Sequence, residues 1–313
     1  MIVTLTLNPA VDKSIAVEQL IPDKKMRCDG MEVEAGGGGI NVSKAIQELG
    51  GESIAIFTSG GFTGKLLTQL LQQKNITVMP IAIEEQTRES FMVNESATAK
   101  QYRFVMPGPA IQEEELNELE QIISGINNVT LLVWSGSLPV GLSPAIITRF
   151  GRMATQRGIK FIADTSGEAL KLALQNGVYL LKPSLTELCS LVGKKYLEPA
   201  EIIGAAQQLI NTGRCEVLVI SMGPAGALLV TKDEIKSFAA PVVKKVSTVG
   251  AGDSMVAGIC WMLESGQSLE EAVKFGVACG TAATINSGTQ LFKKADVLRF
   301  YDWMKEKHAS PQF

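Results

Sequence analysis

The chain has 313 residues, of which 46% are hydrophobic, and it carries a formal net charge of −3. This length and apolar content suffice for one large α/β body, while the scatter of basic residues argues against nucleic acid or a membrane surface as a partner. Five widely spaced cysteines without a CxxC pair, and one histidine, argue against a disulfide framework, a zinc site and a Ser-His-Asp triad.

The N-terminal segment, residues 1–7, is apolar and predicts a strand rather than a signal peptide. It lacks a basic lead and runs directly into Asn8-Pro9. No apolar run in the sequence reaches the roughly 20 residues that a membrane helix needs. We therefore expect a cytoplasmic protein.

Two stretches near the N-terminus and the middle of the chain, residues 14–34 and 88–105, alternate apolar and polar residues as strands with one exposed face do. We expect their antiparallel strands to form one small sheet, built from about 12–34 and 87–105, which would be a lid or equally a dimer contact. Lys25 and Arg27 on one strand, with Arg88 and Arg103 on the other, would then form a phosphate clamp. A solvated strand face explains any one of these cations alone.

Four consecutive glycines, residues 36–39, lead into a predicted helix with Asn41 in its first turn. A flexible hinge is the plain alternative. However, backbone N–H groups beside a polar side chain are suited to holding a sugar. The spacing of GxGxxG is not met here or at 250–255, and residues 60–66 lack the full P-loop pattern, so neither a dinucleotide site nor a P-loop is expected.

From about residue 50 onward, short β-branched runs alternate with longer helical patterns. The predicted strands are 53–58, 76–83, 130–134, 160–163, 178–181 and 216–221, and the predicted helices are 63–74, 113–123, 144–156, 199–210 and 269–283. Such alternation is typical of crossover units and a mostly parallel sheet. We therefore predict the α/β class, with residues 1–313 as a single domain.

Polar side chains follow three of these strands, at the sheet edge where open parallel sheets bind ligands. Ser135 and Ser137 follow strand 130–134, Asp164 follows strand 160–163, and Lys182 follows strand 178–181. Glu187 lies in the first turn of the next helix. A cap or a turn explains each of them alone. Together, the carboxylates would suit a hydrated Mg²⁺, which prefers waters and phosphate oxygens with one or two protein carboxylates.

The run STVGAGDS at 247–254 precedes an amphipathic helical pattern and carries one acidic residue, Asp253. Its glycines permit a tight turn, and the first N–H groups of the following helix have no partners within that helix. Such N–H groups bind anions. The arrangement predicts phosphoryl transfer, with the carboxylate beside the developing negative charge.

Together, GGGGIN at 36–41 and TVGAGDS at 248–254 resemble the two signatures of the ribokinase-like (PfkB) carbohydrate kinases, and the resemblance spans nearly the whole chain. It implies a ribokinase-like sheet flanked by helices, and a lid that pairs two subunits. It also implies ATP and Mg²⁺ as requirements, K⁺ as an activator, and the 1-hydroxyl of fructose 6-phosphate as the phosphoryl acceptor. Fructose 1-phosphate or tagatose 6-phosphate as substrate, and a non-catalytic sugar-phosphate sensor, stay open as alternatives.

The resemblance also implies roles for individual residues. Asp253 would be the base, and the N–H groups of Gly250, Ala251 and Gly252 would form the anion hole. The implied substrate ligands are Asp12, Gly37, Gly38 and Asn41 for sugar hydroxyls, Lys25, Arg27, Arg88 and Ser137 for the phosphate, and also Gly39 and Arg103. The implied nucleotide ligands are Lys182, Ser184, Ser221, Gly223 and Gly226. For the metals they are Glu187 and Asp164 for Mg²⁺, and the carbonyls of Ser247, Val249, Ala283, Asn286 and Gly288 for K⁺.

The chain departs from the family pattern at two positions. The family's Asn-x-x-Glu magnesium motif reads Ser-Leu-Thr-Glu at 184–187, so the amide is absent and Glu187 is kept. Gln290 stands where a near relative carries arginine, beside the implied K⁺ site. The two departures therefore concern the Mg²⁺ motif and the surroundings of the implied K⁺ site.

Overall fold

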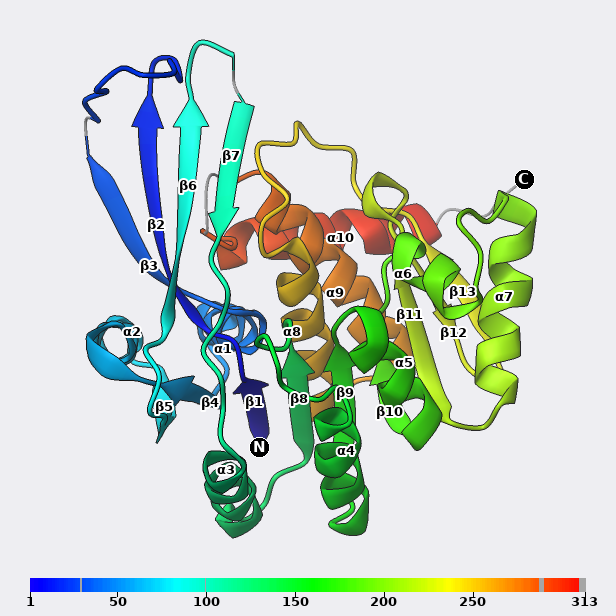
Figure 1. Ribbon diagram of the computed structural model, residues 1–313. Helices are drawn as coiled ribbons and strands as arrows, with labels where there is room; N and C mark the ends of the chain where they lie inside the picture. Colours follow the sequence, from blue (N-terminus) through cyan, green and yellow to red (C-terminus); the bar gives the residue numbers. More distant parts are fainter. Residues whose placement is uncertain (29, 99, 287–289, 310–313) are drawn as a thin grey trace.

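The computed structural model describes residues 1–28, 30–98, 100–286 and 290–309. Within them the central element is a nine-stranded sheet of order β13-β12-β11-β10-β9-β8-β1-β4-β5, shown in Figure 1. The strands are β1 (Ile2–Thr6), β4 (Ser53–Ser59), β5 (Thr77–Ala82), β8 (Leu131–Ser135), β9 (Lys160–Asp164), β10 (Val178–Leu181), β11 (Cys215–Ser221), β12 (Ala227–Val230) and β13 (Ile235–Phe238). The six strands predicted from residue 53 onward are all present.

The sheet is parallel from β5 to β11, and only β12 and β13 are antiparallel additions at one edge. This confirms the predicted α/β class. The chain builds β1, β4 and β5 outward in one direction and then returns to place β8 on the other side of β1. A crevice at the carboxyl ends of the strands is expected at such a reversal, and the polar residues at the ends of β8 and β9 lie there.

Helices cover both faces of the sheet, because its strands alternate apolar side chains between them (Figure 1). Ile2 and Val133 face one layer, while Val3 and Trp134 face the other. The first layer contains α1 (Gly38–Leu49), α8 (Ala251–Glu264), α9 (Leu269–Thr284) and α10 (Lys294–Ala309). The second contains α3 (Glu113–Gly125), α4 (Ile146–Gln156), α5 (Gly167–Asn176), α6 (Leu185–Leu191) and α7 (Pro199–Asn211). A third cluster packs α2 (Gly61–Gln73) against β4.

A second sheet of four strands, the lid sheet, has the order β3-β2-β6-β7 and projects from the large sheet in Figure 1. Its strands are β2 (Ala10–Val17), β3 (Met31–Gly36), β6 (Arg88–Glu95) and β7 (Lys100–Val105). We expected antiparallel strands, but the central pair β2 and β6 is parallel. These two strands follow β1 and β5, which are parallel members of the large sheet, so both leave it in the same direction. Only the returning strands β3 and β7 pair antiparallel.

The expectation that Lys25 and Arg27 lie on a lid strand is wrong. Both residues are exposed, in the non-strand segment between β2 and β3. Pro22 begins a turn there, and Asp23 has a φ of 58°, in the left-handed region that strands do not use. β2 has already ended at Val17, so this segment lies outside the lid sheet, and the chain rejoins the sheet at Met31.

The last helix, α10, continues through Ala309. Val297, Phe300, Tyr301 and Met304 recur at helical spacing and are buried, which holds this helix on the body of the protein. None of the helices in the described ranges is long and apolar enough to cross a bilayer.

Candidate active site

Three elements meet at the carboxylate of Asp253. Asp253 lies in the first turn of α8, Asn41 lies in the first turn of α1, and Ser135 is the last residue of β8. The amide Nδ2 of Asn41 donates to Oδ2 of Asp253 over 2.9 Å, and the hydroxyl of Ser135 donates to Oδ1 over 3.1 Å. An ionised carboxylate only accepts hydrogen bonds, so each of its oxygens is held by one donor.

The ionisation of Asp253 is balanced between opposing effects. Desolvation by the surrounding protein raises its pKa, whereas the hydrogen bonds from Asn41 and Ser135, and the charges of Lys182 and Lys44, lower it. The net pKa lies above the ordinary value for aspartate. A raised pKa makes the carboxylate a better proton acceptor at neutral pH.

The start of α8 lies between two cavities. Gly250 is the N-cap residue, with φ 70° and ψ 2°, a left-handed conformation that glycine adopts without strain. Gly250 and Asp253 line one cavity, while Ala251 and Gly252 line the other. The N–H of Ala251 donates to Thr248 O over a long 3.4 Å. The first N–H groups of α8 are therefore available to an anion at this junction.

The first cavity, which we call the lid cavity, has a volume of about 320 Å³ and lies between the lid sheet and the glycine turn. Six of the expected substrate ligands line it: Asp12, Gly37, Gly38, Asn41, Arg88 and Arg103. Phe91 and Phe104, paired across β6 and β7, line it as well. The cavity thus combines cations, hydrogen-bonding groups and two aromatic rings.

Arg88 and Asp12 are two of the charged residues that line the lid cavity. The guanidinium of Arg88 donates to the carbonyls of Asn8 over 3.0 Å and Met106 over 3.2 Å, and its Nε is buried without a partner. Burial raises the pKa of Asp12, opposed by Lys44, Arg88 and Arg103. An incoming anion would find a cationic group already positioned by two carbonyls, with further guanidinium N–H donors still unused.

Four expected substrate ligands do not line the lid cavity. Lys25 and Arg27 lie in the exposed segment described above. A Cβ on Gly39 would lie 2.6 Å from Thr6 Oγ1 and 2.8 Å from Leu5 O, so this glycine lets α1 pack against β1. Ser137 accepts a hydrogen bond from Asn8 Nδ2 over 3.1 Å. Gly39 belongs to the glycine turn and Ser137 follows β8, but neither residue is part of the lining of the cavity.

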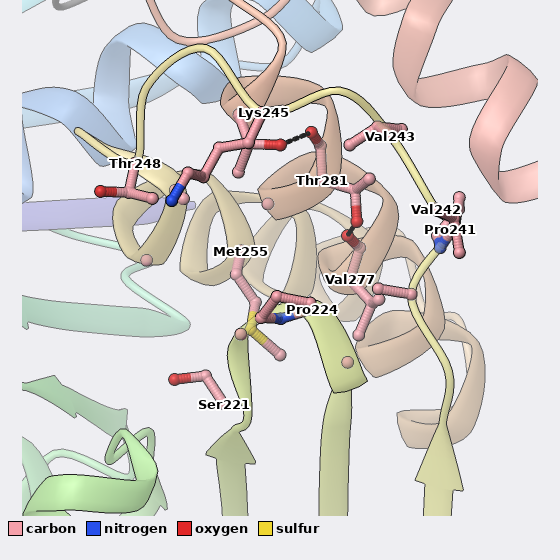
Figure 2. A pocket seen from close by; sticks show the side chains of 17 residues that line it. Ser221, Pro224, Pro241, Val242, Val243, Lys245, Thr248, Met255, Val277 and Thr281 are labelled. Carbon is pink, nitrogen blue, oxygen red and sulfur yellow. Dashed lines mark hydrogen bonds between the residues drawn. The ribbon is translucent and has the colours of Figure 1, made fainter.

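The second cavity, which we call the α8–α9 cavity, has a volume of about 310 Å³. Ser221, Gly223 and Gly226 of the expected nucleotide set line it. Figure 2 shows the apolar side chains of Pro224, Met255 and Val277 around it, together with the loop that carries Val242 and Val243. An apolar slot that ends at a helix N-terminus is suited to a planar base with a phosphate chain.

Lys182 and Asp164 form a buried ion pair beside this junction. Lys182 Nζ lies 3.1 Å from Asp164 Oδ1, and a Cβ on Gly252 would lie only 3.4 Å from the same Nζ. Burial raises the pKa of Asp164 to about 6, even though Lys182 opposes the shift. For Lys182, burial opposes the charged form, but Asp164, Glu187 and Asp253 together outweigh burial and raise the lysine pKa. A cation is therefore held next to the N-terminus of α8.

Ser184 and Glu187 form a capping box at the start of α6. Ser184 N–H donates to Glu187 Oε2 over 2.7 Å, and Glu187 N–H donates to Ser184 Oγ over 3.3 Å. Serine at 184 is thus an effective helix cap in place of the family's asparagine. Ser184 also pairs with Ser221 through an isolated β-bridge, next to the α8–α9 cavity. One oxygen of Glu187 is already engaged in this cap.

The expected metal ligands are brought near one another only in part. In the described part of the chain, no group of three or more His, Cys, Asp or Glu side chains is placed to hold a metal. Asp164 and Glu187 would therefore meet Mg²⁺ mainly through water and phosphate oxygens.

The residues expected to bind K⁺ come from two segments that contact each other. The N–H groups of Val246 and Ser247 donate to Thr284 O over 2.8 and 3.2 Å. This contact places residues 247–249 beside Ala283 and Asn286, and Gly288 lies outside the described residues.

Two residues at this site were not assigned a role from the sequence. Ser135 was noted only as a polar residue at a strand end. Lys44 is buried in α1, donates to Ala35 O over 3.1 Å, and its charge acts on Glu34, Asp12 and Asp253. The sequence signal that could have identified Lys44 is its position on the apolar face of a predicted helix. Charged side chains are rarely buried without a partner, so a lysine there indicates a specific role.

Comparison with known proteins places the chain in a family. The model of the pfkB family carbohydrate kinases matches residues 5–295. The chain is 43% identical to the ATP-dependent 6-phosphofructokinase isozyme 2 of Escherichia coli K12, over 97% of this chain and 98% of that protein. Crystal structures of E. coli phosphofructokinase-2 with potassium and with fructose-6-phosphate match it with TM-scores of 0.93 and 0.92, at 43% and 41% identity. In both cases the match covers 97% of this chain and 99% of that chain. The chain therefore belongs to the pfkB family of carbohydrate kinases.

Proposed function

We propose that the protein is an ATP-dependent 6-phosphofructokinase, which converts fructose 6-phosphate and ATP into fructose 1,6-bisphosphate and ADP. The observation that carries this proposal is the position of Asp253 and the α8 N-terminus between a cationic lid cavity and an apolar α8–α9 cavity. The E. coli relative, 43% identical over 97% of this chain, is a 6-phosphofructokinase and supports the same reaction.

In the proposed mechanism the lid cavity holds the sugar phosphate and the α8–α9 cavity holds the nucleotide. Asp253 accepts the proton as the 1-hydroxyl O–H bond breaks and the new O–P bond to the γ-phosphoryl forms. The N–H groups at 250–252 and Lys182 stabilise the charge on the transferred group, which is the main source of rate in such reactions. Arg88 and Arg103 bind the phosphate already on the sugar, and Asp12 with the glycine turn orients its hydroxyls.

Two cations belong to the proposal. Mg²⁺, when bound, neutralises phosphate charge, and Asp164 and Glu187 are its proposed ligands through water. K⁺ is proposed to bind the carbonyls of Ser247, Val249, Ala283 and Asn286, with Gly288. The crystal structure of E. coli phosphofructokinase-2 in complex with potassium supports K⁺ as a ligand. Replacing K⁺ by Na⁺ at constant ionic strength tests it, and equal turnover in both salts would contradict it.

We also propose a homodimer formed through the lid sheet. Met31 on β3 and Val105 on β7 are 57% and 62% exposed, and apolar side chains at both edges of a sheet favour pairing with another copy. Lys25 and Arg27 stay proposed phosphate ligands, acting in the assembled enzyme because neither lines the cavity of its own chain. E. coli phosphofructokinase-2 also has a tetrameric inhibited form. Sedimentation of the purified protein, with Met31→Glu as the disrupting variant, distinguishes monomer from dimer.

ATP and sugar phosphates are cytoplasmic metabolites, which supports a cytoplasmic location.

The deciding experiment measures ATP consumption by the purified protein with Mg²⁺ and K⁺. The acceptors are fructose 6-phosphate, fructose 1-phosphate, tagatose 6-phosphate and unphosphorylated fructose, compared by kcat/KM. Preference for fructose 6-phosphate supports the proposal. Preference for another sugar phosphate keeps the chemistry and changes the substrate, whereas binding of sugar phosphate without ATP turnover establishes a sensor instead.

A further inference from the structure

The carboxylate of Asp253 is held from two sides by groups that belong to different elements. Asn41 donates from α1 to Oδ2, and Ser135 donates from the end of β8 to Oδ1. Asn41 also keeps a buried, unpartnered Oδ1, which is available as an acceptor for a substrate hydroxyl. Ser135 is 2% exposed and does not line the lid cavity. Its hydroxyl is therefore directed at the carboxylate rather than at substrate.

The position of Ser135 is restricted by an unusually close approach of α1 to the end of β8. A Cβ on Gly38, the first residue of α1, would lie 2.4 Å from Ser135 Oγ and 2.6 Å from Gly136 N. Only glycine permits this distance. The end of β8 is also fixed on its other side, because Gly136 N–H donates to Asp164 O over 3.0 Å. The serine hydroxyl is thus set in position by backbone on both sides.

We propose that Ser135 is a positioning residue for the catalytic base, which keeps the Asp253 carboxylate in one orientation and in its ionised form before substrate binds. The inference deepens the proposed function and rests on Asp253 acting as the base. With Oδ1 and Oδ2 each held by a donor, the carboxylate cannot rotate about its χ2 bond. A fixed orientation of this kind is what general-base catalysis requires.

The charges around Asp253 do not replace this hydrogen bond. Lys44 from α1 and Lys182 after β10 favour the ionised carboxylate, and Asp164 at the end of β9 disfavours it. Lys182 is engaged by Asp164 at 3.1 Å, and Lys44 by Ala35 O at 3.1 Å. Among the described residues, the direct donors to the carboxylate are the side chains of Asn41 and Ser135.

The proton balance of the reaction leaves Ser135 unchanged. The sugar O–H bond breaks and its proton passes to the Asp253 carboxylate, while the sugar oxygen forms its bond to phosphorus. A serine hydroxyl can donate or accept, so Ser135 can turn from donor to acceptor when the neighbouring oxygen becomes protonated. The amide N–H of Asn41 can only donate. Ser135 is therefore the partner that fits both protonation states of the base.

The test compares Ser135→Ala with Ser43→Ala across the pH profile of kcat/KM for the sugar phosphate. Ser43 is a matched control because it is a buried serine of α1 that pairs with Thr4 and Ser53 at 2.8 and 2.9 Å. A hydrogen bond to a charged group changes the ionisation equilibrium constant of that group by roughly tenfold to a hundredfold. In Ser135→Ala we expect the acid limb to move upward by about 1 to 2 pH units. Activity should therefore fall more at low pH than at high pH, with the KM for ATP unchanged.

Other outcomes separate a positioning role from a structural one. A loss in Ser135→Ala that is equal at every pH, as expected for Ser43→Ala, would overturn the inference, as would an unchanged profile. If Ser135→Ala does not fold, Ser135→Cys keeps the volume with a weaker donor, and a smaller shift of the acid limb is expected. A normal profile in Ser135→Cys, together with wild-type kcat, contradicts the inference.

The failure of the proposed function would be recognised separately. Wild-type protein that turns over none of the sugar phosphates refutes the proposed function without involving Ser135. In that case the carboxyl carbon of Asp253 is titrated by ¹³C NMR in the wild type and in Ser135→Ala. A higher aspartate pKa in the variant supports the hydrogen-bonding role, and identical titrations overturn it.

Discussion

Replacement of Gly38 by alanine tests how tightly the site depends on the meeting of α1 and β8. The new Cβ would lie 2.4 Å from Ser135 Oγ, 2.5 Å from Ser135 C and 2.6 Å from Gly136 N, whereas real Cβ contacts are not shorter than 3.0 Å. The first turn of α1 must therefore move by at least the difference of 0.4 to 0.6 Å, because two of the opposing atoms are backbone. Asn41 lies in that same turn.

The shift sets the size of the expected effects. Overpacking of this kind costs about 1 to 3 kcal/mol of stability. A misplacement of about 1 Å in an active site lowers the rate roughly 10²-fold, so we expect kcat to fall about tenfold or more at about half that shift. The affinity for ATP should be unchanged, since Gly38 lines the lid cavity and not the α8–α9 cavity.

A second glycine provides the control for this experiment. Gly204 lies in α7, and a Cβ there would meet nothing within 4 Å. Gly204→Ala should stabilise the protein by about 0.5 to 1 kcal/mol, because glycine is a poor residue for a helix interior, and leave turnover unchanged. Urea unfolding followed by tryptophan fluorescence gives the stabilities, and a coupled ATPase assay gives kcat and KM. Wild-type kcat in a folded Gly38→Ala protein would refute the reasoning.

Three further substitutions address the base, the ion pair and the phosphate end of the site. Asp253→Asn should fold normally, because the new amide can form hydrogen bonds with both Asn41 and Ser135. Its kcat in the coupled assay should fall about 10²- to 10⁴-fold. Normal turnover would show that another group is the base. Lys182→Met leaves the Asp164 carboxylate buried without its partner and should cost about 3 to 5 kcal/mol at pH 8 in urea unfolding. The aspartate pKa lies above its unfolded value, so protonation favours the folded state and stability falls as pH rises; the Lys182→Met loss should therefore be smaller at pH 5. An equal loss at both pH values, or no recovery in the double variant with Asp164→Asn, would argue against a buried pair. Arg88→Met should raise the KM for fructose 6-phosphate and not that for ATP in steady-state kinetics, and equal changes in both would place Arg88 outside the phosphate site.

The local elements and the two glycine motifs could be predicted from the sequence. Strands such as 160–163 and helices such as 113–123 follow from the periodicity of apolar residues, which is a property of neighbouring positions. The positions of Asp253 and Asn41 at helix starts follow from the glycine turns before them, since a turn and a helix N-terminus are also local features. The α/β class followed because alternating strands and helices have few ways to pack.

Contacts between distant segments were decided by the tertiary structure. The parallel pairing of β2 with β6 depends on the direction in which each strand leaves the large sheet, and no pattern within either strand encodes that direction. Lys25 and Arg27 alternate like strand residues, but β2 ends at Val17, and both residues lie in the segment before β3 that turns at Asp23.

The roles of Ser135 and Lys44 likewise required the fold. A serine at a strand end and a lysine in a helix are ordinary in sequence, and each becomes significant only because the residues opposite it come from other parts of the chain. Ser135 and Asp253 are 118 positions apart, and they meet because the start of α8 lies against the end of β8, where Gly38 of α1 also packs closely against Ser135. The sequence by itself determined which groups are available for the chemistry, and tertiary packing determined which of them meet, because hydrogen bonds and charges act over a few ångströms of space and not over distance along the chain.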